Sequence, residues 1–117
     1  MKFSFEKLDV WKEAMSLVKE IYKMSRKFPD EERYGVISQI QRAAVSIPVN
    51  IAEGRGRRHT KEQIQFFYTS RGSLYEIITL LKVSLSLDFI TQGEYNSAIG
   101  RCENILRKLS GLINALK

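Results

Sequence analysis

The chain has 117 residues, of which 44% are hydrophobic and 27% are charged, and its formal net charge is +6. This size and balance are typical of one globular domain, and they exclude a multidomain enzyme and a disordered chain. No uncharged apolar run approaches the roughly 18 residues of a membrane span, and no apolar run follows the charged amino terminus, so we expect neither a span nor a signal peptide. With a single cysteine, Cys102, a reducing, cytoplasmic setting is expected. The excess of Lys and Arg favours anionic partners such as nucleic acid.

Apolar residues recur at spacings of three and four along most of the chain, which is typical of amphipathic helices. Asp9 is expected to cap the first helix, and Pro29 to end it. Pro48 lies inside the second helix and removes the hydrogen bond to the carbonyl of Ala44. The four predicted helices cover approximately residues 9–28, 34–53, 61–87 and 92–116.

Two further helix starts have the form of a capping box. Thr60 with Gln63 is expected to begin the third helix, and Thr91 with Glu94 the fourth. The loops between the helices are short, and short loops make sequential helices antiparallel. We therefore predict an all-α, up-down-up-down antiparallel four-helix bundle that forms one domain over residues 1–117.

The two middle helices carry few charged residues. These are Arg42 and Glu53 between residues 34 and 53, and Arg71, Glu76 and Lys82 between residues 64 and 87. A helix that is apolar on most sides needs cover beyond its own bundle, so we predict self-association through these two helices. The alternative is an asymmetric bundle that leaves a few apolar side chains exposed. The residues expected outside the core seams are Val36, Val45, Val49, Phe66, Ile77, Leu80, Val83 and Leu87.

Residues 55–61, with the sequence Arg-Gly-Arg-Arg-His-Thr-Lys, contain four permanent cations, one titratable histidine and no acid. Arginine matches phosphate oxygens in a two-pronged fashion, and the free amides of a helix start follow immediately. We predict a site for a nucleic-acid backbone here. The alternative is a solvated loop whose arginines cap the preceding helix. The predicted contact residues are Arg55, Arg57, Arg58, Lys61 and His59.

Catalytic chemistry has little support in the sequence. His59 lies in the basic loop and Cys102 on a helix seam, so no nucleophile and base are paired, and two such residues cannot complete a zinc site. Glu53 and Glu76 could form an acid and base pair, although arginines on the same helices offer each a countercharge. We expect no catalytic residue, no metal and no cofactor.

We instead predict that the polar residues of the middle helices form a network that fixes helix packing or a subunit interface. Its members are Arg42, Asn50, Glu53, Arg71 and Glu76.

Five stretches together resemble a known family: residues 5–11, 28–29, 32–35, 39–54 and 71–76. Within them, the run Ser-Ile-Pro-Val-Asn-Ile-Ala-Glu-Gly, residues 46–54, is the most specific. The chain resembles the four-helix-bundle protein family encoded in intervening sequences of bacterial 23S ribosomal RNA genes. Val49 departs from the small polar residue that this family pattern has between the proline and Asn50, which bears on the subunit contact.

The resemblance implies a basic homopentameric barrel, related in fold to the accessory variability determinant protein of diversity-generating retroelements, which binds nucleic acid and a reverse transcriptase. It carries no catalytic residue across. Two hypotheses follow. In the first, the protein is a non-catalytic, oligomeric RNA-binding protein that contacts phosphates through its basic loop. In the second, it is a protein-interaction scaffold or an accessory subunit of a nucleic-acid enzyme such as a reverse transcriptase.

Overall fold

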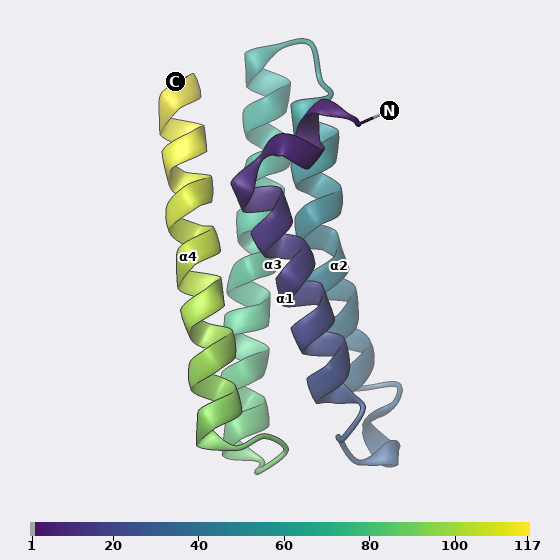
Figure 1. The fold of residues 1–117 in the computed structure, drawn as a ribbon. Coiled ribbons are helices and arrows are strands. Elements are labelled where there is room, and N and C mark those ends of the chain that lie inside the picture. The colour runs from purple at the N-terminus through teal and green to yellow at the C-terminus, as the bar shows by residue number, and fades with distance from the viewer. Residues whose placement is uncertain (1) are drawn as a thin grey trace.

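The computed structural model describes residues 2–117, which form four helices and two short 3-10 helices. Consecutive helices run antiparallel, and the last packs back against the first, which closes the bundle (Figure 1). The predicted up-down-up-down bundle is therefore confirmed. The elements are η1 (Ser4–Lys7), α1 (Asp9–Ser25), η2 (Asp30–Glu32), α2 (Val36–Arg55), α3 (Thr60–Ser86) and α4 (Gln92–Leu116).

The two ends of the bundle differ in what they present. The C-terminus, η1 and the α2–α3 loop lie at one end, whereas the α1–α2 and α3–α4 loops lie at the other (Figure 1). The molecule is 43 Å long and about half as wide, with extents of 43 × 24 × 23 Å. No helix within residues 2–117 is long and apolar enough to cross a membrane.

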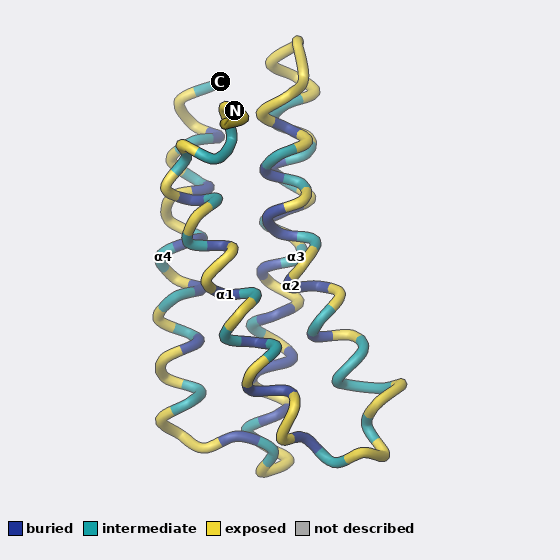
Figure 2. Tube along the Cα trace, turned by 45° about the vertical axis from the view of Figure 1, so that its right-hand side comes forward, coloured by how far each residue is buried: buried dark blue, intermediate teal, exposed yellow. Residues whose placement is uncertain are grey.

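Each helix turns one stripe of side chains toward a common core (Figure 2). Ile77 and Leu80 were expected outside the seam of the third helix, and this prediction is wrong, because both are buried. α3 packs against α2 on one side and α4 on the other, so its buried arc is wider than one seam. Fully buried side chains include Leu17, Ile21, Ile40, Ile47, Ile51, Phe67, Leu74, Ile77, Leu81, Ile105, Leu109 and Ile113.

The first helix begins at Asp9 as predicted, but its N-cap and its C-terminal end differ from the prediction. Leu8 is its N-cap, no side chain caps it, and Asp9 is already helical, so the expected capping role of Asp9 is wrong. The chain enters α1 directly from η1, which leaves no extended residue at Asp9. α1 ends at Ser25 because the chain tightens there into a turn, in which the Phe28 amide donates to the Ser25 carbonyl (3.1 Å). Phe28 is nevertheless buried against Phe89.

The second helix begins at Val36, two residues later than predicted, after the turn of η2. The amide of Val36 donates to the Glu32 carboxylate (3.4 Å), so a side chain from before the helix satisfies one free donor at its start. The helix also continues to Arg55, two residues beyond the predicted end, and Gly56 follows as its C-cap.

One of the two predicted capping boxes forms. The Glu94 amide donates to Thr91 Oγ1 (3.1 Å), and the Thr91 amide donates to the Glu94 carboxylate (2.9 Å), which confirms the start of α4. The box expected at Thr60 and Gln63 is wrong. His59 is the N-cap of α3, and Gln63 instead donates its amide group to the carbonyl of Arg57 (2.8 Å).

α2 and α3 come very close where small and polar residues face each other. The Ser70 hydroxyl donates to the Ile47 carbonyl (2.9 Å), and the Ser73 and Ser46 hydroxyls are hydrogen-bonded (2.8 Å). At Gly54, an added Cβ would lie 2.8 Å from a ring carbon of Phe67, closer than real side chains come. Only glycine therefore fits at this position, and its lack of a side chain allows the two helices to come close next to the basic loop.

Candidate nucleic-acid interface

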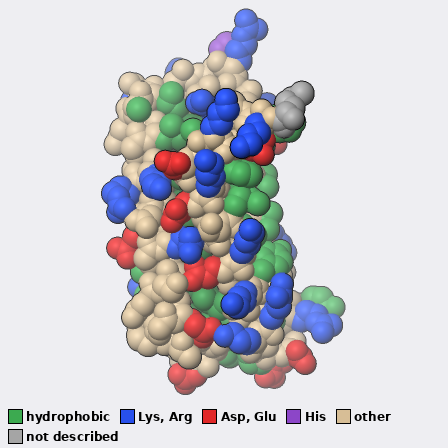
Figure 3. All heavy atoms as spheres, in the orientation of Figure 1, with side chains coloured by type: hydrophobic (Ala, Val, Ile, Leu, Met, Phe, Trp, Pro, Cys, Tyr) green, Lys and Arg blue, Asp and Glu red, His purple; other side chains and the backbone are tan. Residues whose placement is uncertain are grey.

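The basic loop projects from the end of the bundle between α2 and α3. The exposed side chains of residues 55–61 gather at the upper tip of the molecule in Figure 3. Two hydrogen bonds hold the turn: the Gln63 side chain donates to the Arg57 carbonyl (2.8 Å), and the Gln63 amide donates to the His59 carbonyl (3.0 Å). The loop therefore presents its cations from a defined backbone.

One of the four predicted cations is already engaged by the protein. Arg57 pairs with the Glu53 carboxylate at 3.0 Å, and its guanidinium carbon lies 4.7 Å from the centre of the Phe66 ring. Glu53 is four residues earlier, so the spacing typical of helix ion pairs was present in the sequence and could have revealed this contact. Arg57 is thus the least available of the loop cations.

The remaining loop cations carry uncompensated charge. Arg55, Arg58 and Lys61 are exposed, and none of them forms an ion pair within residues 2–117. His59 is exposed beside them as the N-cap of α3. The first amides of this 27-residue helix face the same region, and they add partial positive charge that Glu62 in the first turn offsets in part.

The predicted polar network does not form as a connected set. Glu53 pairs with Arg57, and the Asn50 side chain donates to the Ser46 carbonyl (2.8 Å) and hydroxyl (2.9 Å) of its own helix. Arg71 lies over the ring of Tyr68, 4.8 Å from its centre. Within residues 2–117, no hydrogen bond or ion pair joins any two of the five predicted members.

The structure does bring two of those members to one place. Arg42 and Glu76 line a cleft of about 280 Å³ on the outer seam between α2 and α3, and both are exposed. Arg42 donates to the Ser38 hydroxyl at 3.5 Å, which is the limit of a hydrogen bond. Within a protomer, the part of the predicted network that remains is the shared cleft of Arg42 and Glu76.

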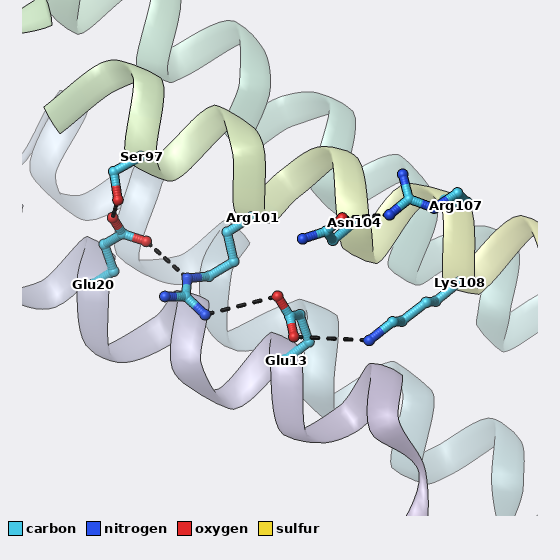
Figure 4. A network of polar contacts seen from close by, with 7 residues as sticks. All are labelled: Glu13, Glu20, Ser97, Arg101, Asn104, Arg107 and Lys108. Atoms are coloured by element: carbon cyan, nitrogen blue, oxygen red, sulfur yellow. Dashed lines mark hydrogen bonds and ion pairs between the residues drawn. The ribbon is translucent and has the colours of Figure 1, made fainter. Parts of the chain in front are cut away.

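A separate set of ion pairs joins the first and last helices (Figure 4). Arg101 of α4 lies 2.9 Å from Glu20 and 3.8 Å from Glu13 of α1, and Lys108 lies 3.9 Å from Glu13. Ser97 donates to Glu20 at 2.7 Å. The paired residues are about 75 to 95 positions apart in the chain, so the sequence pattern alone carried no signal of these contacts.

Two observations concern the cysteine and the side chains that could bind a metal ion. Cys102 is fully buried, and burial raises the pKa of its thiol to about 12, which keeps it protonated at neutral pH. Among the described residues, no three His, Cys, Asp or Glu side chains are grouped so that they could hold a metal ion.

Comparison with known proteins identifies the family. Residues 6–111 match the model of the 23S rRNA-intervening sequence proteins. The chain belongs to this family. The resemblance carried by residues 46–54 is thus confirmed, and two residues of that run, Ser46 and Gly54, lie at the close contact between α2 and α3.

A solved structure shares the fold. It is a protein of unknown function from the S23 ribosomal protein family of Bacteroides thetaiotaomicron VPI-5482, with 20% sequence identity and a TM-score of 0.83. The match covers 89% of this chain and 97% of that one. No curated protein sequence is significantly similar to the chain. Membership of the 23S rRNA-intervening sequence protein family and the bundle fold are therefore shown, and the function has to be argued from the surface.

Proposed function

We propose that the protein is a non-catalytic, oligomeric, cytoplasmic RNA-binding protein that contacts phosphate groups through residues 55–61. The observation that carries the proposal is the exposure of Arg55, Arg58 and Lys61 on a hydrogen-bonded turn, with no ion pair to any of them within residues 2–117. Uncompensated cations attract a polyanion and release its counterions on binding. The turn lacks exposed aromatic rings between its cations, which favours contacts to the backbone over contacts to bases.

The non-catalytic part of the proposal rests on the state of the reactive side chains. The Cys102 thiol is protonated and buried, while His59 is exposed on the turn at the end of the bundle. Glu53 and Glu76, the candidate acid and base, are both exposed, and Glu53 is bound to Arg57. Carboxylates exposed to water are poor candidates for general acid and base catalysis.

The proposal is tested by titrating a fluorescent, structured ribosomal RNA fragment with nuclease-treated protein at several salt concentrations. We expect log affinity to fall linearly with log salt, with a slope of roughly 0.7 to 0.9 for each phosphate neutralised. A slope above about 3 would require cations beyond those of one loop, because one loop offers three uncompensated charges. Absence of binding at low salt would contradict RNA binding altogether.

The oligomeric part of the proposal rests on exposed apolar side chains. A groove of about 390 Å³ runs between η1, α1 and α2, and Met15, Val45 and Val49 in it are 36, 38 and 49% exposed. Hydrophobic side chains gather there on the right-hand side of Figure 3, where α1 borders α2. Val45 and Val49 of α2 both line this groove, whereas Ile77 and Leu80 of α3 are buried in the protomer. We therefore propose that subunits associate through this groove.

The oligomer prediction is tested by light scattering after size-exclusion chromatography. We expect the native protein to elute as a multiple of the 13.5-kDa protomer, five times if it forms the ring that the family resemblance implies. Val45→Asp with Val49→Asp places charges in the groove and should give monomers, because buried unpaired carboxylates are costly. Val83→Asp, which changes an equally exposed valine of α3, is the matched control and should leave the assembly intact. Dissociation by the control and not by the double variant would move the interface to α3.

The same groove supports a second candidate function, a scaffold or accessory subunit for a nucleic-acid enzyme such as a reverse transcriptase. A partner protein, rather than a second copy, would then cover Trp11, Met15 and Val49. One stoichiometric protein that stays bound through nuclease treatment, together with a monomeric free state, would favour this function over the first.

A further inference from the structure

A second basic surface lies on the long side of the bundle, away from the loop. A cleft of about 550 Å³ runs between α1 and α4, lined by the cations Lys19, Lys23, Lys27 and Arg101 and by the carboxylates Glu20 and Glu94. The two helices spread apart in this half of the molecule, toward the end opposite the basic loop (Figure 1).

The carboxylates of this cleft are already occupied by donors from the protein. Glu20 accepts hydrogen bonds from Arg101 (2.9 Å) and Ser97 (2.7 Å). Glu94 is bound to Lys27 and closes the capping box of α4, and these contacts lower the pKa of its carboxyl group, so it stays ionised at neutral pH. Neither acid is therefore available to neutralise the remaining lysines.

Lys19 and Lys23 are the lysines that remain. Both are exposed, and neither forms an ion pair or a side-chain hydrogen bond within residues 2–117. Lys19 and Lys23 lie four residues apart on one face of α1, a rise of about 6 Å along the helix, and Lys27 follows beyond the helix end at Ser25. Lys and Arg side chains are spread over this face in Figure 3.

We propose that the α1–α4 cleft is a second phosphate-binding surface for RNA, in which Lys19 and Lys23 contact the backbone. The ligand class rests on the proposed function, whereas the surface is independent of the loop. Since the bundle is 43 Å long and the charges of a duplex strand are about 3.4 Å apart along its axis, an RNA that follows the whole bundle needs roughly thirteen base pairs. The cleft would thus align the RNA along the bundle instead of leaving it attached at one tip.

The test compares Lys19→Ala with Lys23→Ala, made together, against Lys7→Ala with Arg33→Ala. The control removes the same charge from exposed side chains outside both surfaces. With a twenty-base-pair RNA, we expect the cleft variant to lose about tenfold in affinity at 0.1 M salt and about 1.5 in salt slope, since two phosphate contacts are removed. The control should change affinity less than twofold. Equal behaviour of the cleft variant and the control would overturn the inference.

Measuring a loop variant in parallel separates this inference from the proposed function. Loss of affinity in the loop variant and not in the cleft variant overturns the cleft and supports the loop. The reverse result supports the cleft and overturns the loop. If both variants lose affinity, both surfaces bind, and if the native protein binds no RNA, both proposals are wrong. Circular dichroism should be unchanged throughout, because the lysines removed are exposed and unbonded within the described residues.

Discussion

Replacing Arg55, Arg58 and Lys61 together by alanine should lower the affinity for RNA at 0.1 M salt on the order of a hundredfold, because three phosphate contacts per loop are removed. The salt slope should fall by roughly 2 to 3 for each loop that engages the RNA. Helix content and assembly should not change, since the three side chains are exposed and unpaired within residues 2–117. Anisotropy titration and light scattering measure the two effects on the same samples.

The ion pair beside the loop provides a control that moves affinity in the opposite direction. Glu53→Gln removes the carboxylate that holds Arg57 and should release a fourth cation to the RNA. We expect affinity to rise severalfold and the salt slope to increase by somewhat less than 1, because Arg57 still packs on Phe66. An unchanged affinity in both the triple variant and Glu53→Gln would show that the loop does not contact RNA.

Gly54→Ala should destabilise the fold by about 1 to 3 kcal/mol, the range expected for overpacking of a tight core. The added Cβ would lie 2.8 Å from Phe67 and 3.0 Å from the Cβ of Phe66, and Phe67 is buried and cannot move aside. The gain in helix propensity, about 1 kcal/mol, offsets part of this cost. Urea unfolding at a fixed protein concentration measures the change, since assembly also contributes to stability.

Gly100→Ala is the matched control for this substitution. Gly100 lies inside α4, and an added Cβ would meet nothing within 4 Å. We expect it to stabilise the protein by about 0.5 to 1 kcal/mol, because alanine loses less backbone entropy than glycine in a helix. Equal effects of the two substitutions would mean that α2 and α3 can separate at Gly54 without cost, contrary to their close packing.

Sequence patterns that span only a few residues were enough to predict the four helices, one helix start and the basic loop. The periodic seams predicted four helices, and Thr91 with Glu94 predicted the start of the last one. The exposure of the cations in residues 55–61 could also be predicted from the sequence, because a short polar loop between two helices lies on the surface. Helix formation and capping depend on neighbours three or four positions away, so a sequence displays them directly.

Tertiary structure decided what depends on how the helices are rotated against one another. Ile77 and Leu80 are buried because α3 has neighbouring helices on two sides. Of the five residues of the predicted polar network, Arg42 and Glu76 line one cleft because these faces of α2 and α3 adjoin. In the cleft that Lys19 and Lys23 line, the carboxylate of Glu20 binds Arg101, eighty-one residues away, and not these lysines. Rotation of a packed helix is set by side chains of all its neighbours at once, and this information is spread over the whole chain rather than held in any one segment.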